Sequence, residues 1–164
     1  MHDKLLTIRT ALIDDTSLLT AIIRTSFRRI AVKFDLTPEN CPRHPSNCTD
    51  EWIRNDFNRG ATYYILEKNG KAQGCVALEK ASSGLCYLER LAVLPEALKK
   101  GFGRMLVDHV ITEARHSGAN TISIGIIAHQ TDLKAWYEKL GFIQGETTEF
   151  EHLPFQVAFM TYRL

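Results

Sequence analysis

The spacing of apolar residues along the chain predicts four helices. After Asp14 or Asp15, either of which can cap a helix, apolar residues recur at helical spacing through residue 30. A shorter helix is expected between Thr49, its capping residue, and Gly60. The other two are expected over 101–118 and 130–141, and each ends at a glycine.

Strand patterns fill the stretches between these helices. Residues 6–9 alternate between apolar and polar side chains, and the apolar runs over 61–67 and 72–78 flank Asn69-Gly70, a strong hairpin signal. Further strands are expected over 85–94, 121–127 and 157–164. This order of elements predicts an α/β domain with a mixed sheet flanked by helices.

Length, composition and charge agree with a single domain over residues 1–164. A chain of 164 residues with 45% hydrophobic side chains can fill one core. Its 20 basic and 19 acidic side chains are interspersed and leave a net charge of +1, so neither a nucleic acid nor a membrane is implied as a partner. No apolar run approaches the roughly 20 residues that span a bilayer. Since Met1-His2-Asp3-Lys4 also lacks the apolar stretch of a secretory signal, we expect a cytoplasmic protein.

The most informative segment joins the strand over 85–94 to the helix that follows it. Its loop holds Gly101 and Gly103 beside three basic residues, Lys99, Lys100 and Arg104. Backbone N–H groups at the start of a helix lack partners within the helix and attract anions, and glycines allow phosphate oxygens to approach closely. Neither a P-loop pattern nor the third glycine of a dinucleotide fingerprint is present. The segment is therefore either a phosphate site of another kind or a tight turn with solvated lysines.

A second segment favours the phosphate interpretation. Tyr137-Glu138-Lys139-Leu140-Gly141-Phe142 ends the last predicted helix, and with Leu98-Lys99-Lys100-Gly101-Phe102-Gly103 it resembles the GNAT family of N-acetyltransferases. In that family a Gln/Arg-x-x-Gly-x-Gly/Ala loop holds the pyrophosphate of acetyl-CoA, and a later helix ends in a pattern like Tyr-Glu-Lys-x-Gly-Phe. Leu98 departs from the usual Gln or Arg, but backbone N–H groups, which any residue supplies, make most of such a contact.

The resemblance implies a GNAT-like fold, with a mixed, twisted sheet whose central strands, those holding Leu91 and Thr121, splay apart where acetyl-CoA inserts. It implies transfer of the acetyl group to a primary amine of a small molecule or peptide, by direct attack in a ternary complex. A homodimer is compatible with the family. Gln130 stands where the family often has an Asn that binds the pantetheine arm. The residues that the resemblance assigns to the cofactor are Leu91, Ala92, Val93, Leu98, Lys99, Lys100, Gly101, Phe102, Gly103, Arg104 and Gln130.

Two residues are candidates for the proton transfers that accompany attack of an amine on a thioester. Tyr137 stands where the family protonates the departing thiolate, and a phenol, with a reference pKa of about 10, is protonated at neutral pH. The alternative is a tyrosine that is packed only by its ring. Glu89 is the candidate base, because strand alternation predicts that it shares a face with Leu91 and Val93. A salt bridge from Glu89 to Arg90 or a lysine, or a water relay in place of a direct base, remains open.

Three residues are candidates for binding the acceptor amine. Arg43 and His44 lie between the first two predicted helices, a region that walls the acceptor site in the family. His152 precedes the final strand, where family members close over the acceptor, although a plain surface position is the alternative. Cys41, His44 and Cys48 have a spacing that suggests zinc, but only three ligands are local and the prolines among them suit a rigid connector.

Three functions are distinguished by these observations. An N-acetyltransferase binds acetyl-CoA and turns over an amine. A non-catalytic acyl-CoA sensor or interaction module binds the cofactor without turnover, and a metal-binding interaction domain takes up zinc through its Cys-His loop. The motifs favour the first function, with acetyl-CoA as the cofactor and no metal.

Overall fold

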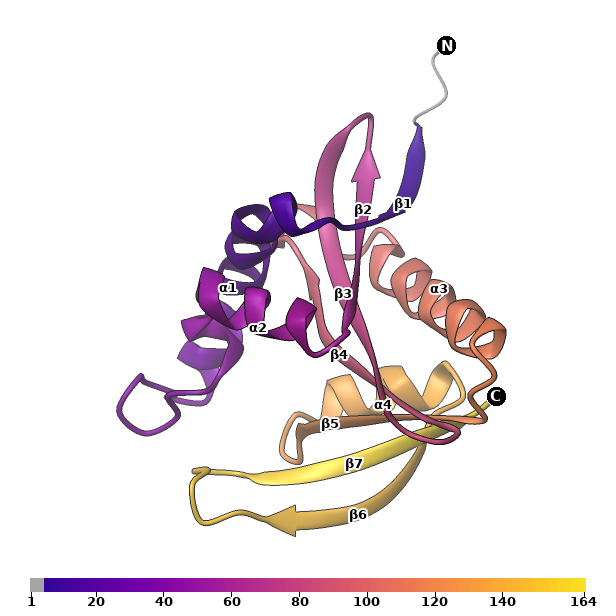
Figure 1. The fold of residues 1–164 in the computed structure, drawn as a ribbon. Coiled ribbons are helices and arrows are strands. Elements are labelled where there is room, and N and C mark those ends of the chain that lie inside the picture. Colours follow the sequence, from indigo (N-terminus) through magenta and orange to yellow (C-terminus); the bar gives the residue numbers. More distant parts are fainter. Residues whose placement is uncertain (1–4) are drawn as a thin grey trace.

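The structure is a computed structural model, and it describes residues 5–164. The stretch from Met1 to Lys4, on which the expectation about a secretory signal rests, lies outside the described residues. One seven-stranded sheet has the order β1-β2-β3-β4-β5-β7-β6 (Figure 1). Its strands are β1 (Leu6–Thr10), β2 (Thr62–Lys68), β3 (Lys71–Ser82), β4 (Leu85–Val93), β5 (Thr121–Ile127), β6 (Ile143–Glu149) and β7 (Gln156–Arg163). The helices are α1 (Thr16–Lys33), α2 (Asp50–Asn58), α3 (Phe102–His116) and α4 (Thr131–Lys139), with short 3-10 turns η1 (Ile13–Asp15), η2 (Pro45–Asn47) and η3 (Pro95–Ala97).

Helices pack on both faces of this sheet (Figure 1). On one face, α1 and α2 bury Leu19 and Ile53 against Tyr63 of β2. On the other face, α3 and α4 bury Leu106 and Tyr137 in a larger cluster with the central strands. The predicted mixed α/β fold is therefore confirmed. None of the helices within residues 5–164 is both long and apolar enough to cross a membrane.

The strands β4 and β5 pair only where they begin. Their parallel register joins residues 85–87 to residues 121–123, and no pairing continues beyond these residues across this junction in the described chain. Figure 1 shows the two strands diverging from that point. The splayed pair implied by the resemblance is present, and it leaves the β5 side of β4 without a partner strand from residue 88 onward.

A β-bulge interrupts β4 shortly after the strands part. Cys75 of β3 pairs with Ala92 and Ala77 pairs with Glu89, so β4 contributes one residue more than β3 between these two pairs. Arg90 lies in the bulge with a φ of 52°. This left-handed conformation is uncommon for a residue other than glycine.

The bulge changes the face to which Glu89 belongs. Glu89 stands opposite Ala77, which is part of the cluster beneath α1 and α2, whereas Leu91 and Val93 pack against the cluster beneath α3. The prediction that Glu89 shares a face with Leu91 and Val93 is therefore wrong. The physical reason is that one extra residue shifts the strict alternation of side chains between the two faces of a strand.

The edge strand β6 is absent from the sequence prediction. It pairs with β7 alone, and all but one of its side chains are exposed, including Ile143 at 70%. Because neither face of β6 is buried, its sequence carries no apolar alternation from which a strand is recognised.

Candidate cofactor and active site

The loop between β4 and α3 presents a run of free backbone donors. From Lys99 to Arg104, no backbone N–H donates to an acceptor within residues 5–164, and the first helical bond runs from the Met105 N–H to the Gly101 carbonyl. These N–H groups lie at the positive end of the α3 dipole. Such a run of N–H groups is suited to an anion with several oxygens, such as a pyrophosphate.

The shape of this loop depends on left-handed backbone conformations. Gly101, directly before α3, has a φ of 83°, and Lys99 has a φ of 62°. A Cβ placed on Gly101 would meet no atom within 4 Å, so this position is open to a ligand. Lys99, Lys100 and Arg104 are exposed and add positive charge, and the nearest carboxylate to the Arg104 guanidinium is that of Asp108, at 3.8 Å.

Two residues assigned to the cofactor loop contribute little through their side chains. Leu98 is half-buried, and its N–H donates to the Pro95 carbonyl at 3.4 Å. Phe102 is buried in the core beneath α3, which leaves only its N–H facing the loop. The free donors therefore begin at Lys99, one residue after the family's usual Gln or Arg position.

The helix α4 closes tightly on the start of α3. A Cβ on Gly103 would lie 3.3 Å from Cζ2 of Trp136 and 3.9 Å from Cγ2 of Val93. The glycine therefore makes room for the indole, which is a different use from the close phosphate approach that the sequence suggests for Gly103. Through this contact, α3, α4 and the end of β4 form one unit around the splayed strands.

Tyr137 is both a core residue and a free hydrogen-bond donor. Its side chain is 4% exposed, and its ring lies edge-on to those of Trp136 and Phe142, at 4.9 and 5.2 Å between centroids. The hydroxyl makes no hydrogen bond within residues 5–164, and its oxygen is not sealed from the surface. Burial raises the pKa of Tyr137, so the hydroxyl stays protonated.

Gln130 lies where β5 leads into α4. Its backbone is fixed, because its N–H donates to the Ile127 carbonyl at 2.9 Å and its carbonyl accepts from the Lys134 N–H at 3.1 Å. The side-chain amide has no hydrogen-bond partner within residues 5–164. Gln130 thus follows the end of β5, the strand that diverges from β4 and leaves Leu91, Ala92 and Val93 without a partner on that side.

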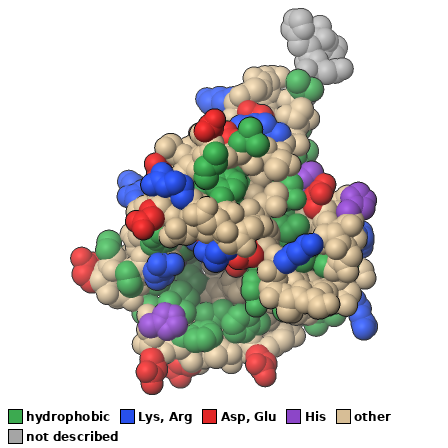
Figure 2. Space-filling view, viewed as in Figure 1, with side chains coloured by type: hydrophobic (Ala, Val, Ile, Leu, Met, Phe, Trp, Pro, Cys, Tyr) green, Lys and Arg blue, Asp and Glu red, His purple; other side chains and the backbone are tan. Residues whose placement is uncertain are grey.

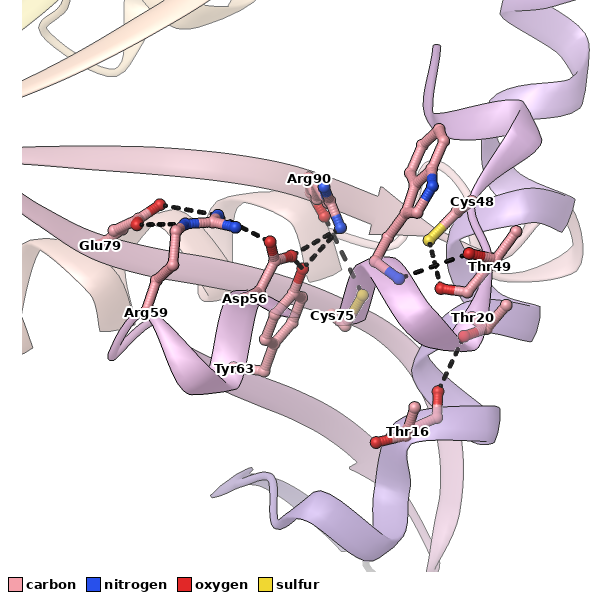
Figure 3. Close-up of polar contacts among 11 residues, drawn as sticks. Thr16, Thr20, Cys48, Thr49, Asp56, Arg59, Tyr63, Cys75, Glu79 and Arg90 are labelled. Carbon is pink, nitrogen blue, oxygen red and sulfur yellow. Dashed lines mark hydrogen bonds and ion pairs between the residues drawn. The ribbon is translucent and has the colours of Figure 1, made fainter. Parts of the chain in front are cut away.

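Figure 3 shows a buried ionic network on the opposite face, and the charges of its members Asp56, Arg59, Glu79 and Arg90 all act on the pKa of Glu89. Asp56 of α2, which is 3% exposed, is 2.6 Å from Nη1 of Arg90 and 2.7 Å from Nη2 of Arg59. Glu89 itself has no ion pair or hydrogen bond through its carboxylate within residues 5–164. Burial raises the pKa of Glu89, and the charge of Glu79 adds to this effect. The salt bridge to Arg90 that the sequence leaves open is not formed, because Arg90 turns to Asp56.

The candidates for the acceptor have different surroundings. Arg43 is exposed and lies over the ring of Trp52, 4.9 Å from its centroid. His44 is 6% exposed, and its Nδ1 is 2.7 Å from the Ser46 hydroxyl. Because it caps η2 from a buried position, the geometry gives His44 a structural role and does not favour its prediction as a substrate ligand. His152 is exposed in the loop between β6 and β7.

The cysteines near His44 are not arranged as a metal centre. Within residues 5–164, no three His, Cys, Asp or Glu side chains are grouped so as to hold a metal ion. Burial raises the pKa of the Cys41 thiol and, to about 11, that of Cys48, whereas it lowers the pKa of His44 to about 4. These thiols stay protonated, and a thiolate is the form that binds zinc.

Figure 2 shows that the surface is hollowed between the part that carries α1 and α2 and the part formed by β6 and β7. Hydrophobic side chains line much of this hollow in that view. In the same orientation, β4 and β5 diverge there (Figure 1).

Comparison with known proteins identifies the family to which this architecture belongs. The sequence model of the acetyltransferase (GNAT) family matches residues 23–142, which include the cofactor loop and the end of α4. The chain belongs to the GNAT family. Its mixed, seven-stranded sheet flanked by helices is thus the fold of a GNAT domain.

Curated relatives of this GNAT chain act on different acceptors. The amino-acid acetyltransferase of Neisseria meningitidis serogroup A is 32% identical over 105 residues, which make up 63% of this chain and 22% of that protein. The [ribosomal protein bS18]-alanine N-acetyltransferase of Escherichia coli K12 is 32% identical over 95 residues, or 56% of this chain and 64% of that protein. The chain thus spans less than two thirds of the length of these relatives.

Solved GNAT structures share the fold over almost the whole chain. The ribosomal-protein-S18-alanine N-acetyltransferase from Escherichia coli superposes with a TM-score of 0.75 at 18% identity, covering 97% of this chain and 94% of that one. The PaiA N-acetyltransferase from Thermoplasma acidophilum, solved in complex with coenzyme A, has a TM-score of 0.73 at 18% identity and covers 98% of this chain and 99% of that one.

Sequence reasoning missed the ionic network of Arg90 and one contact at the start of α3. In the sequence, Asp56 has the pattern of an ordinary helix residue and Tyr63 that of an ordinary strand residue. Nothing in their spacing links them to Arg90. Trp136 carries a weak signal, because a large aromatic residue next to Tyr137 suggests packing but not its contact with Gly103. These pairings are tertiary contacts, and local patterns do not encode them.

Proposed function

We propose that this protein is an acetyl-CoA-dependent N-acetyltransferase that transfers the acetyl group to a primary amine of a small molecule or peptide. The observation that carries the proposal is the run of unpaired N–H groups from Lys99 to Arg104 beside the open side of β4. These two features lie together at the point where a GNAT cofactor enters the sheet. Family membership and the coenzyme A complex of the Thermoplasma relative support the same cofactor.

The residues of the site fit the parts of this cofactor. The loop from Lys99 to Arg104 would hold the pyrophosphate with its N–H groups, and the open backbone of β4 at 91–93 would hold the pantetheine arm by strand-like hydrogen bonds. The side-chain amide of Gln130 has no partner within residues 5–164 and would be available to the arm. When bound, acetyl-CoA supplies an activated thioester.

Two side chains are suited to the proton transfers. The Tyr137 hydroxyl is protonated and uncommitted, so it can donate to the sulfur that leaves the acetyl group. The Glu89 carboxylate has no counterion in contact, so it can accept the proton of the attacking amine, directly or through a water molecule. An N–H of the open β4 backbone would donate to the carbonyl oxygen as negative charge develops there.

The acceptor class follows from chemistry that the relatives share. An amino acid and an alanine residue can both offer an α-amine, whose nitrogen is one carbon away from a carbonyl carbon. The hollow between α1, α2 and the β6–β7 strands is the route by which such an amine would approach β4 (Figure 2). Arg43 and His152 remain the candidates for contacts to the acceptor.

Calorimetric titration of acetyl-CoA into the wild-type protein tests the cofactor site. We expect one saturable site, and Gly101→Asp should weaken binding about tenfold or more, because its carboxylate repels the pyrophosphate at close range. Gly101→Asn is the matched control, since it has the same size and tolerates the same φ without the charge. The absence of binding in the wild type would overturn the proposal.

Turnover assays with a panel of amines separate the enzyme from a sensor that only binds. With any accepted amine, Tyr137→Phe and Glu89→Gln should each lower kcat by about 100-fold, while both variants bind acetyl-CoA as the wild type does. Binding without turnover on any amine, together with indifference to Tyr137→Phe, would favour the non-catalytic acyl-CoA module instead.

A further inference from the structure

The bulge of β4 is held by contacts from outside the strand. Among the described residues that are not glycine, Arg90 is the one that has a positive φ within a strand, and the others lie in loops. Such a conformation persists only where the surroundings enforce it. The question is therefore which residues enforce the conformation of Arg90.

Asp56 is the main partner of the Arg90 side chain. Nη1 of Arg90 is 2.6 Å from Oδ2 of Asp56 and donates to the Tyr63 hydroxyl at 3.1 Å. The guanidinium also lies over the ring of Trp52, 5.7 Å from its centroid. Figure 3 shows Arg90 reaching from β4 toward Asp56 on α2. The helix α2 thus fixes the bulge through one buried ion pair.

Of three carboxylates on this face, two have a guanidinium partner and one has none. Arg59 bridges Asp56, at 2.7 Å, and Glu79, at 3.0 Å, so both of these carboxylates have a guanidinium partner. Asp56 also accepts a hydrogen bond from Tyr63 at 2.5 Å. Glu89 is adjacent to Arg90 in the chain, yet it has no ion pair within residues 5–164.

We propose that Asp56 is a positioning residue for catalysis: by pairing with Arg90 it holds the β4 bulge and keeps the neighbouring Glu89 carboxylate free of a counterion. A carboxylate paired with a guanidinium is a weak proton acceptor, whereas an unpaired and partly buried one is strong. This inference rests on the proposed role of Glu89 as the base.

The charged groups around Glu89 determine whether its pKa rises or falls when Asp56 or Arg90 is replaced. Burial raises the pKa of Glu89 most, Glu79 on β3 and Asp56 on α2 raise it further, and Arg90 on β4 and Arg59 after α2 lower it. Removing the charge of Asp56 takes away one repulsion and releases Arg90 toward Glu89. Both effects lower the pKa of Glu89. Removing Arg90 has the opposite effect.

An NMR titration of the Glu89 side-chain carboxyl tests the proposal without substrate. In Asp56→Asn the pKa of Glu89 should fall below the wild-type value, and in Arg90→Met it should rise above it. Methionine keeps the unbranched stem of Arg90, and Asp56 retains Arg59 and Tyr63 as partners, so this variant is expected to fold. If Asp56→Asn does not fold, the result for Arg90→Met decides alone. The amide signals of residues 91–93 should also move in Arg90→Met, since the bulge loses its anchor.

Arg9→Met is the matched control. Arg9 likewise joins two carboxylates, those of Asp15 at 2.8 Å and Glu67 at 2.9 Å, but none of these three residues is among the groups that shift the pKa of Glu89. The Arg9→Met variant should therefore leave the pKa of Glu89 unchanged. The proposal is overturned if the pKa of Glu89 stays at the wild-type value in Arg90→Met, or if Asp56→Asn and Arg90→Met shift it in the same direction.

Activity distinguishes this inference from the proposed function. If an amine is turned over, the acid limb of the kcat/KM profile should move to lower pH in Asp56→Asn and to higher pH in Arg90→Met. In Asp56→Asn, kcat should fall about tenfold or more while acetyl-CoA binding is retained. If the wild type acetylates no amine, the proposed function fails, and the NMR titration still decides whether Asp56 controls Glu89.

Discussion

His44 and Glu89 are both buried ionisable residues, and burial shifts their pKa values in opposite directions. It lowers the pKa of His44 to about 4 and raises the pKa of Glu89. The cause is the same in both, because burial disfavours the charged form, which is protonated in histidine and deprotonated in glutamate. The consequences differ: His44 becomes a fixed neutral cap, whereas the pKa of Glu89 moves toward the neutral range that suits a base.

The neutral state of His44 predicts a loss of stability in mild acid. The pKa of a histidine is ordinarily 6.5, and that of His44 in the folded protein is about 4. Between these two pH values, the unfolded chain binds a proton that the folded chain does not. The stabilisation is therefore complete above pH 6.5 and falls as the pH drops through this window. From the two pKa values we expect a loss of about 2 kcal/mol in the free energy of unfolding by pH 5.

Urea unfolding at pH 7 and pH 5 measures this loss. His44→Asn keeps a side-chain acceptor for the Ser46 N–H and has no group that titrates in this range, so its stability should depend less on pH. Equal pH dependence in the wild type and the variant would show that folding does not lower the pKa of His44.

Among the elements, α3 follows from the sequence more directly than β4 does. The glycines and the apolar stripe of α3 locate its start, and free N–H groups at that start are a general property of helices. The bulge of β4 has no such signal, because Arg90 takes a conformation for which glycine is the usual residue. It is enforced by Asp56 of α2, a contact between distant segments. This is why alternation placed Glu89 on the wrong face, and why the loop before α3 could be predicted while the ionic network could not.

Where β3 pairs with β4, the close approach of the two backbones predicts that replacing Gly74 lowers stability. A Cβ on Gly74 would lie 2.5 Å from the carbonyl oxygen of Ala92, next to the bulge. Since a backbone atom cannot yield as a side chain does, Gly74→Ala should lower the free energy of unfolding by about 2 kcal/mol. Gly145→Ala is the control, because its Cβ would meet its nearest neighbour, the Phe159 carbonyl oxygen, at 3.6 Å and should change stability by less than about 0.5 kcal/mol. Similar values for the two variants in chemical denaturation would contradict the close contact at Gly74.

For the whole molecule, the divergence of β4 and β5 joins two faces that a closed sheet would separate. Glu89 belongs to the face beneath α1 and α2, and Tyr137 to the face beneath α3 and α4. A ligand between the diverging strands can reach both faces, since no third strand lies between them in the described chain. The resemblance to a family suggested this gap, whereas apolar patterns alone show only that both strands are buried.

This arrangement predicts where acetyl-CoA should slow hydrogen exchange. Protection should concentrate at residues 88–104, where the open side of β4 and the free N–H groups of the loop lie, and at residues 130–140, which include α4. Saturation at 100 times Kd stabilises the folded state by about 2.7 kcal/mol, so slowly exchanging core amides will also gain some protection. The fast-exchanging amides of the loop separate the two effects, because global stabilisation leaves them unchanged and a direct contact does not. Hydrogen exchange measured by mass spectrometry should therefore show slower exchange at residues 99–104 when acetyl-CoA is added to the wild type. The control variant Gly101→Asp should show no such change. Protection confined to the core would place the cofactor elsewhere.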